Sequence, residues 1–376
     1  MSLSGVTGLV VSWPDHAPWR LRMTARDYVA LSLLPSARRR APPALAALPS
    51  ESLDAPDALE LLISYCTRQA EGLDAITGRL RSDADAVLGC AAELDIGVIT
   101  WADPTYPAIL RTIPEAPLVL WVAGRIDVLE RPGIAVVGSR AASTGGLEVA
   151  ERLGHDLAAA GLPVVSGLAR GCDAAAHRGA LAAGGDTIAV LGCGPDVVYP
   201  AEHRALYTRI RERGAIVSEL PPGMPPLPAH FPQRNRIISG LARGVVVVEA
   251  SEKSGSLITA ACALEQGREV MAVPGSILGS RHRGCHGLLR DGARLVETAA
   301  DVLEELGSAA PRPSSAEPID RDPLLALLET EGDSDLDVLA GRTGLAVAVL
   351  LQRLLSLELA GLVRRAPGGR FVRVCR

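Results

Sequence analysis

The sequence predicts an α/β fold: a Rossmann-like, doubly wound and mostly parallel sheet, flanked by a small all-α N-terminal module and a C-terminal winged-helix domain. The main observation is that short apolar runs alternate with amphipathic stretches between residues 133 and 306, the pattern of β-α units in series. Before this region, apolar residues recur at helical spacing between prolines, and after it helical stretches precede a hairpin. Strands are predicted at 134–137, 163–165, 187–191, 215–217, 244–248, 269–273 and 293–296.

The same patterns divide the chain into segments. Residues 1–22 show no clear periodicity and form an N-terminal extension, whereas residues 23–100 form the helical module. Residues 101–306 form the Rossmann-like domain, which begins with a turn-rich, proline-containing approach. Residues 307–322 have the composition of a flexible linker, and residues 323–376 form the winged-helix domain. Within that domain, helices are expected at Pro323–Thr330, Leu336–Thr343 and Val347–Ala360, before a final hairpin.

The composition is that of a globular protein with large cores, since 48% of the residues are hydrophobic. The sequence shows neither an apolar stretch of about 20 residues, as a bilayer span needs, nor a signal peptide. We therefore expect a cytoplasmic protein without a membrane partner. The cysteines are scattered and form no C-x-x-C pair, so we expect neither a disulfide framework nor a metal site. The net charge of -5 requires any nucleic-acid site to be local.

Residues suited to anions follow the predicted strands. Gly138, Ser139 and Arg140 combine a close backbone, a hydroxyl and a cation at the point where a strand ends and a helix begins. Arg234-Asn-Arg236 and Lys253-Ser-Gly-Ser-Leu257 lie near other strand or helix ends, and Lys253 is the single lysine of the chain. Because the carboxyl ends of parallel strands meet at one edge of a sheet, these segments are predicted to bind one phosphate-bearing ligand.

Several short motifs lie between residues 94 and 300. They are Ala135-Val-Val-Gly-Ser-Arg140, Ser166-Gly-Leu-Ala-Arg-Gly-Cys-Asp173, Tyr199-Pro200, Phe231-Pro-Gln-Arg-Asn-Arg-Ile-Ile238, Ser254-Gly-Ser-Leu-Ile-Thr-Ala260 and Val273-Pro-Gly275. Together they resemble the motifs of the DNA processing protein A family, called DprA or Smf. The helical module and the tail also match the longer members, which carry a SAM or helix-hairpin-helix-like module and a winged helix. The resemblance implies a protein that binds single-stranded DNA and loads the recombinase RecA, chiefly in natural transformation. It further implies a homodimer without catalytic activity or cofactor.

The resemblance also assigns roles to individual residues. It places Arg140 on a backbone phosphate, Lys253 on a second phosphate and the loop from Ser254 to Leu257 against the strand. Where the family has asparagines, this chain has His203 and His286. The predicted DNA-binding site comprises Gly138, Ser139, Arg140, Ser166, Gly167, Phe231, Arg234, Asn235, Arg236, Lys253, Ser254, Gly255, Ser256 and Leu257.

Structural roles compete with these functional ones. The alternative for Arg234 and Arg236 is pairing with Glu219 or Glu249, and the alternative for Gly138 to Arg140 is a simple strand-to-helix turn. Asp173 and His177 have the i,i+4 spacing of a metal or acid–base pair, but no further ligand has suitable spacing around them. We therefore interpret Asp173 as an N-cap and His177 as a packed, hydrogen-bonded helix residue.

Two other functions compete with DNA binding by the central domain. The first is a nucleotide-processing enzyme of the phosphoribohydrolase type on a related Rossmann-like fold. Its Pro-Gly-Gly-x-Gly-Thr-x-x-Glu motif is absent, and no Walker A loop is found. The second is a regulator that reads DNA with its winged helix. The predicted recognition helix, Val347–Ala360, has Arg353 as its single cation, which favours protein contact or packing.

Overall fold

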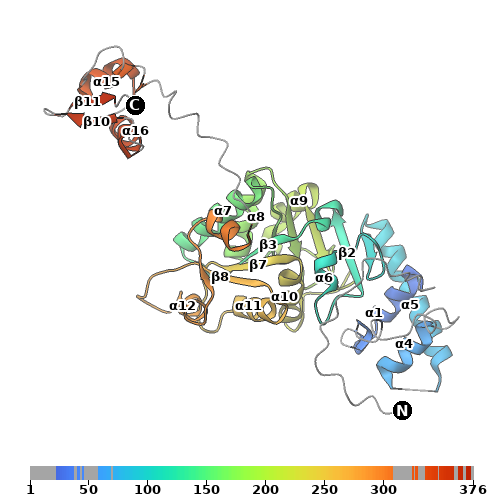
Figure 1. The fold of residues 1–376 in the computed structure, drawn as a ribbon. Helices are drawn as coiled ribbons and strands as arrows, with labels where there is room; N and C mark the ends of the chain where they lie inside the picture. Colours follow the sequence, from blue (N-terminus) through green and yellow to red (C-terminus); the bar gives the residue numbers. More distant parts are fainter. Residues whose placement is uncertain are drawn as a thin grey trace. The chain divides into compact units, whose positions relative to one another are not determined.

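The structure is a computed structural model, and the chain divides into two compact units, Met1–Ala310 and Pro311–Arg376 (Figure 1). The predicted extension at 1–22 and all but the first residue of the predicted linker lie outside the described residues. The structure describes residues 23–37, 40–42, 45, 58–68, 71–307, 324–325, 327–328, 335–345, 347–359, 363–366 and 370–373.

In the described part of the first unit, nine strands form one sheet in the order β1-β2-β6-β5-β4-β3-β7-β8-β9. All neighbours from β6 to β9 in this order are parallel, whereas β2 pairs antiparallel with β1 and β6. The strands are β1 (Gly97–Thr100), β2 (Val119–Gly124), β3 (Gly133–Val137), β4 (Val164–Ser166), β5 (Thr187–Val190), β6 (Ala215–Ser218), β7 (Ala242–Val247), β8 (Glu269–Ala272) and β9 (Arg294–Leu295).

The strand order reverses between β3 and β7. From β3 the chain runs through β4, β5 and β6 on one side, and then returns to β7 on the other side. Such a switch point leaves a crevice at the carboxyl ends of the two strands, where open α/β sheets bind their ligands. The predicted DNA-binding residues that follow β3 and β7 therefore lie where open α/β sheets bind their ligands.

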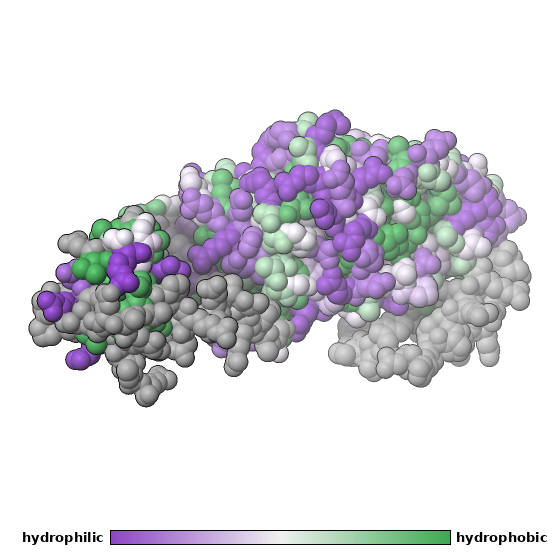
Figure 2. Space-filling model, turned by 90° about the horizontal axis from the view of Figure 1, so that it is seen from above, coloured by the Kyte–Doolittle hydropathy of each residue, from purple (hydrophilic) through white to green (hydrophobic). Residues whose placement is uncertain are grey.

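Helices cover both faces of the sheet (Figure 1). On one face, α7 (Thr144–Ala159), α8 (Cys172–Ala182), α9 (Arg204–Arg213) and α13 (Ala299–Glu305) pack on the strands; on the other lie α6 (Ala108–Arg111), α10 (His230–Gly240), α11 (Ser256–Glu265) and α12 (Arg283–Arg290). Alternation along β3 sends Ile134 and Val136 to the first face and Ala135 and Val137 to the second. On the surface seen in Figure 2, hydrophilic residues predominate, and hydrophobic ones form smaller patches between them.

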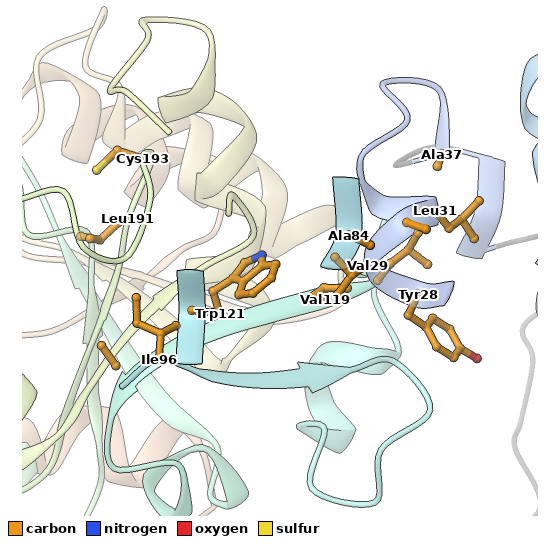
Figure 3. Packing of buried hydrophobic residues seen from close by; sticks show 14 of the residues in the cluster. Tyr28, Val29, Leu31, Ala37, Ala84, Ile96, Val119, Trp121, Leu191 and Cys193 are labelled. Carbon is orange, nitrogen blue, oxygen red and sulfur yellow. The ribbon is translucent and has the colours of Figure 1, made fainter. Parts of the chain in front are cut away.

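The N-terminal helices share a core with the sheet (Figure 3). They are α1 (Ala25–Ser32), α4 (Ala58–Thr67) and α5 (Leu73–Glu93). Val29 of α1 and Ala84 of α5 are buried in one cluster with Val119 and Trp121 of β2. Thr24 and Asp27 form a capping box that begins α1, and Asp27 also accepts a hydrogen bond from Arg81 of α5. The module is thereby packed on the β1–β2 end of the sheet.

The predicted strands of the central domain are confirmed, because each of the apolar runs contains or overlaps one strand from β3 to β9. Neither β1 nor β2 is predicted from the sequence, because residues before 101 have a helical pattern and the stretch that follows is rich in turn residues. Prolines at 114 and 117 favour loop, yet Leu118 to Ala123 are all buried inside the sheet. The N-terminal helices pack on β2 and bury it. A local sequence pattern does not reveal such a long-range contact.

The second unit has the predicted winged-helix arrangement. Its described elements are α15 (Leu336–Thr343), α16 (Val347–Leu359), β10 (Val363–Ala366) and β11 (Arg370–Arg373), and the two strands pair antiparallel. Gly344 ends α15 with a φ of +66°, a left-handed conformation that glycine adopts without strain. Leu339, Leu354 and Phe371 belong to a core of its own. Across the described residues of both units, no helix is long and apolar enough to span a bilayer.

Candidate functional site

A cleft of about 590 Å³ lies at the carboxyl ends of β3 and β7, at the switch point of the sheet. Most of the predicted site residues line it. A smaller hollow of about 30 Å³ adjoins the cleft and is lined by Gly167. The predicted residues that line the main cleft are Gly138, Ser139, Arg140, Phe231, Arg234, Asn235, Ser254, Gly255 and Ser256.

The loop after β3 forms the first wall of the cleft. Gly138 is required by packing, because a Cβ there would lie 2.5 Å from Cys172 Sγ. The backbone N–H of Ser139 donates to the carbonyl of Glu249 at 2.7 Å, which joins this loop to the segment that follows β7. Arg140 is exposed, and its guanidinium carbon lies 5.4 Å from the centre of the Phe231 ring. The wall thus holds a solvent-accessible cation against an aromatic face.

The N-terminus of α11 forms the second wall. Ser254 and Ser256 lie with their hydroxyl oxygens 2.8 Å apart, and Gly255 is the N-cap residue of the helix. Asn235 of α10 donates from Nδ2 to the carbonyl of Gly255 at 3.2 Å, which fixes the loop in front of the helix. The first backbone N–H groups and the dipole of a helix give its N-terminus a positive potential. Two sources of positive charge, this helix end and Arg140, therefore meet in one cleft.

Two of the predicted residues in this second segment lie away from the lining. Lys253 is exposed and is not one of the residues that line the cleft. It directly precedes Ser254, which does line the cleft. Leu257 is half-buried and packs against the apolar cluster under α10 and α11. Leu257 therefore anchors the loop to the core.

Arg234 lines the cleft, although it is only 5% exposed. Its Nη1 donates to the carbonyls of Gly167, at 2.7 Å, and of Val190. Burial lowers the pKa of Arg234 to about 10, against the opposing effect of Asp173, so the guanidinium stays charged at neutral pH. The side chain thereby joins the ends of β4 and β5. It lines the cleft, but these backbone bonds occupy its Nη1.

Arg236 and Ser166 are buried away from the cleft lining. Arg236 donates from Nη2 to Glu219 Oε1 at 2.6 Å, and its Nε lies 3.9 Å from Glu115. The structural pairing considered for Arg236 in the sequence analysis is therefore present. Ser166 donates from its hydroxyl to the carbonyl of Val136 at 2.7 Å and so ties β4 to β3. Both residues support the site from inside the fold.

Asp173 has a different role from the predicted one. The N-cap of α8 is Gly171, with a φ of +75°, and Asp173 is the second residue of the helix. Its Oδ2 accepts hydrogen bonds from the N–H groups of Gly167, at 3.1 Å, and Ala169, at 3.4 Å. Burial raises the pKa of this carboxyl group, whereas Arg234 and the two N–H groups act in the opposite direction. Its carboxylate orders the loop between β4 and α8.

His177 is a packed, hydrogen-bonded residue, as predicted. It is fully buried, and its Nδ1 lies 2.7 Å from the hydroxyl oxygen of Thr187, which itself donates to the carbonyl of Val164. Thr187 must then accept from the Nδ1–H of His177. Burial, reinforced by the charge of Arg234, lowers the pKa of His177 to about 3. A neutral, enclosed imidazole is unsuited to acid–base work, and the described residues contain no cluster with metal-ligand composition.

Tyr199 is the main lining residue that is missing from the predicted DNA-binding site. It is 42% exposed, borders both the cleft and the adjoining hollow, and its ring centre lies 5.4 Å from that of Phe231. The sequence holds a signal for it, the Tyr199-Pro200 pair among the family motifs, but spacing alone does not bring residue 199 next to residue 231. The two residues meet because the chain passes through α9 and β6 after residue 199 and then returns to the cleft in α10, which carries Phe231.

His203 and His286 both act as donors to backbone carbonyls. His203 donates from Nδ1 to Leu168 at 3.0 Å, and His286 donates from Nε2 to Gly275 at 3.1 Å. Each bond fixes a loop near the carboxyl edge of the sheet. Both imidazoles therefore have a structural hydrogen-bonding role in these loops.

Comparison with known proteins agrees with this architecture. The sequence profile of a family described as DNA recombination-mediator protein A matches residues 97–307. The chain belongs to this family. The profile of the DprA winged helix domain matches residues 308–369, so the two profiles together span residues 97–369 and reach into both units. The family predicted from the sequence motifs is confirmed.

Three relatives illustrate the similarity. Protein Smf of Escherichia coli K12 is 44% identical over 283 residues, which is 72% of this chain and 75% of that protein. The X-ray structure of DprA from Streptococcus pneumoniae superposes with a TM-score of 0.67 and 39% identity, covering 75% of this chain and 98% of that one. A structure of the Helicobacter pylori protein, described for its single-stranded DNA binding mode, has a TM-score of 0.51 and 26% identity. It covers 56% of this chain and 95% of that one.

Proposed function

We propose that this chain is a recombination mediator that binds single-stranded DNA in the cleft between β3 and β7. The observation that carries the proposal is the position of Arg140. It is exposed, it lines the same cleft as the N-terminus of α11, and it has no ion pair with any residue that the structure describes. A free guanidinium beside a helix N-terminus suits the oxygens of a phosphodiester backbone.

The lining of the cleft favours a single strand over a duplex or an isolated phosphate. Besides its polar residues, the cleft is bordered by Tyr199, Pro228, Pro232 and Ile258. Apolar and aromatic surface next to a cation suits an unstacked nucleotide, whose base is accessible, and a base inside a duplex does not offer that face. The single-stranded DNA binding mode described for the Helicobacter pylori relative supports the same ligand class.

The acidic residues of the site support binding over turnover. Cleavage of a nucleotide at its sugar, as in a phosphoribohydrolase, needs a carboxylate directed at the reacting carbon. Asp173 is the one carboxylate among the cleft-lining residues, and it is buried against two backbone N–H groups. Glu249, at the end of β7, is also buried and accepts from the N–H and hydroxyl of Ser143. We therefore propose a non-enzymatic, cofactor-independent role.

The proposal includes loading of RecA onto the bound strand, in the cytoplasm and in natural transformation, by a homodimer. Membership of a recombination-mediator family supports it. The test is RecA-dependent ATP hydrolysis on oligonucleotides coated with single-strand-binding protein. Addition of the protein should shorten the lag before hydrolysis, and an unchanged lag would contradict the RecA part. Sedimentation velocity tests the homodimer, which a monomer at micromolar concentration would exclude.

The DNA-binding part is tested by fluorescence anisotropy with labelled oligo-dT, a duplex of equal length and a mononucleotide. The single strand should bind most tightly. Arg140→Ala should weaken binding to every sequence and reduce the slope of log K against log salt by about 0.7 for each phosphate that is no longer neutralised. Arg152→Ala, which removes an exposed arginine from α7, is the matched control and should change neither quantity. Unchanged affinity and slope in Arg140→Ala would place the DNA site elsewhere.

A further inference from the structure

We infer that Tyr199 provides a base-stacking site beside Arg140, so that the cleft binds a nucleobase as well as the phosphate backbone. The inference rests on the proposed function and deepens it, because it names the second chemical group that the site recognises. A cleft that used charge alone would bind any polyanion. One with an aromatic platform requires a strand that carries bases.

The accessible ring in the cleft is that of Tyr199. Its side chain is 42% exposed, whereas Phe231 is half-buried and its ring lies under the guanidinium of Arg140, 5.4 Å from the ring centre. The backbone of Gly192 also approaches Phe231, since a Cβ there would lie 3.0 Å from Cδ1. Phe231 is therefore a positioning residue for Arg140, and Tyr199 is the ring that a ligand can reach.

The arrangement places the two binding groups next to each other. The ring centres of Tyr199 and Phe231 are 5.4 Å apart with an angle of 39° between their planes, and the guanidinium carbon of Arg140 lies at the same distance from the Phe231 ring centre. Arg140 and Tyr199 both line the cleft and the adjoining hollow, so they border the same space. A strand held at Arg140 by its backbone can thus lay a base on Tyr199 without leaving the cleft.

The segment that carries Tyr199 is fixed before a ligand binds. The carbonyl of Pro200 accepts from the N–H of His203 at 3.0 Å, and His203 in turn donates to Leu168. Glu202 pairs with Arg170 across the same two loops. A ring held on an anchored segment loses little conformational freedom when a base stacks on it, so more of the stacking energy appears as affinity.

The test compares normal and abasic single strands of equal length and charge. Tyr199→Ala should weaken binding of oligo-dT by about 5- to 150-fold, the equivalent of 1–3 kcal/mol for one stacked base. It should leave the affinity for the abasic strand and the salt slope unchanged, because every cation that binds phosphate is still present. Tyr199→Phe should bind like the original protein. Tyr65→Ala, which removes a 53% exposed tyrosine from α4, is the matched control.

The outcomes separate this inference from the proposed function. If the unsubstituted protein fails to bind single strands, the proposed function is wrong. If it binds, and Arg140→Ala weakens it while Tyr199→Ala does not, only the stacking site is refuted. A Tyr199→Phe variant as weak as Tyr199→Ala would also refute stacking, because the phenyl ring keeps the π face and lacks only the hydroxyl. Circular dichroism of each variant confirms that the fold is retained.

Discussion

Two layers of polar residues in and around the central sheet serve different purposes. The exposed layer consists of Arg140, Tyr199 and Lys253, which are accessible to a ligand. The buried polar layer consists of Asp173, His177, Arg234 and Arg236, each at most 9% exposed and hydrogen-bonded inside the fold. Arginine occurs in both layers, so residue type alone does not distinguish a ligand contact from a structural one. The direction in which each side chain points determines whether it can contact a ligand or only other parts of the fold.

Helix geometry explains why the two arginines of α10 are structural. Arg234 points at the ends of β4 and β5, where two carbonyls accept from it, and Arg236 points at Glu219. A buried guanidinium is tolerated only when such partners compensate for its missing hydration. Arg140 follows a strand end instead, where the chain turns outward and its charge remains in water. The following predictions test this division between the layers, from the largest expected effect to the smallest.

Arg234→Met should have the largest effect on stability. The variant keeps most of the side-chain volume but leaves the carbonyls of Gly167 and Val190 without their donor and Asp173 without its nearby cation. Removal of one partner from a buried charged network costs about 3–5 kcal/mol. Urea unfolding followed by circular dichroism should show this decrease in the free energy of unfolding of the first unit.

Arg140→Ala is the control for that measurement. An exposed side chain that has no ion pair among the described residues should change the free energy of unfolding by less than about 0.5 kcal/mol. If Arg140→Ala destabilised the protein as much as Arg234→Met, the assignment of the two arginines to different layers would be incorrect.

His177 should make stability depend on pH. Its pKa is about 3 in the folded protein and about 6.5 in the unfolded chain, so below pH 6.5 only the unfolded chain takes up the proton. The free energy of unfolding should therefore fall as the pH is lowered, by about 2 kcal/mol between pH 7 and pH 5. The His177→Gln variant should lack this pH dependence. The difference in the free energy of unfolding between the original protein and the variant should therefore decrease by the same amount between pH 7 and pH 5. A constant difference would show that His177 titrates normally and is not enclosed.

Lys253 tests the extent of the exposed layer. Because it precedes Ser254 at the cleft, Lys253→Ala should weaken single-strand binding, and its effect should be coupled to that of Arg140→Ala by about 0.5 kcal/mol or more. A double-mutant cycle with oligo-dT at one fixed salt concentration measures the coupling. Strict additivity of the two effects would indicate that the residues contact separate stretches of DNA, and the single cleft would then have to be abandoned.

Removal of the second unit should have the smallest effect. All the residues proposed to bind DNA lie in the first unit, and the described residues of α16 carry Arg353 as their single cation. A chain that ends at residue 308 should bind oligo-dT within about twofold of the full chain, since few contacts are expected to cross a linker. A truncated protein that stays folded by circular dichroism but binds oligo-dT far more weakly would move the site to the second unit.

The sheet and the position of the cleft can be predicted from the sequence, whereas the roles of individual side chains are predicted less well. Apolar runs locate β3 to β9, and polar residues after β3 and β7 locate the cleft, because in a doubly wound sheet strand ends converge. The roles of Arg234 and Arg236 depend on their orientation on α10 and on acceptors far away in the sequence, such as Gly167 and Glu219. Tyr199 is missed for the same reason, since its neighbour Phe231 is distant along the chain.

The hydrogen bond from Ser139 to the carbonyl of Glu249 links the two loops that leave the switch point in opposite directions. Because this bond ties the walls to each other, we expect the width of the cleft to change little when a ligand binds. The conformational change that binding requires then takes place in the nucleic acid. Oligo-dT, a flexible chain, needs only to be straightened, whereas the self-stacked helix of oligo-dA must first come apart. A rigid protein site thereby turns the stiffness of the strand itself into a source of discrimination.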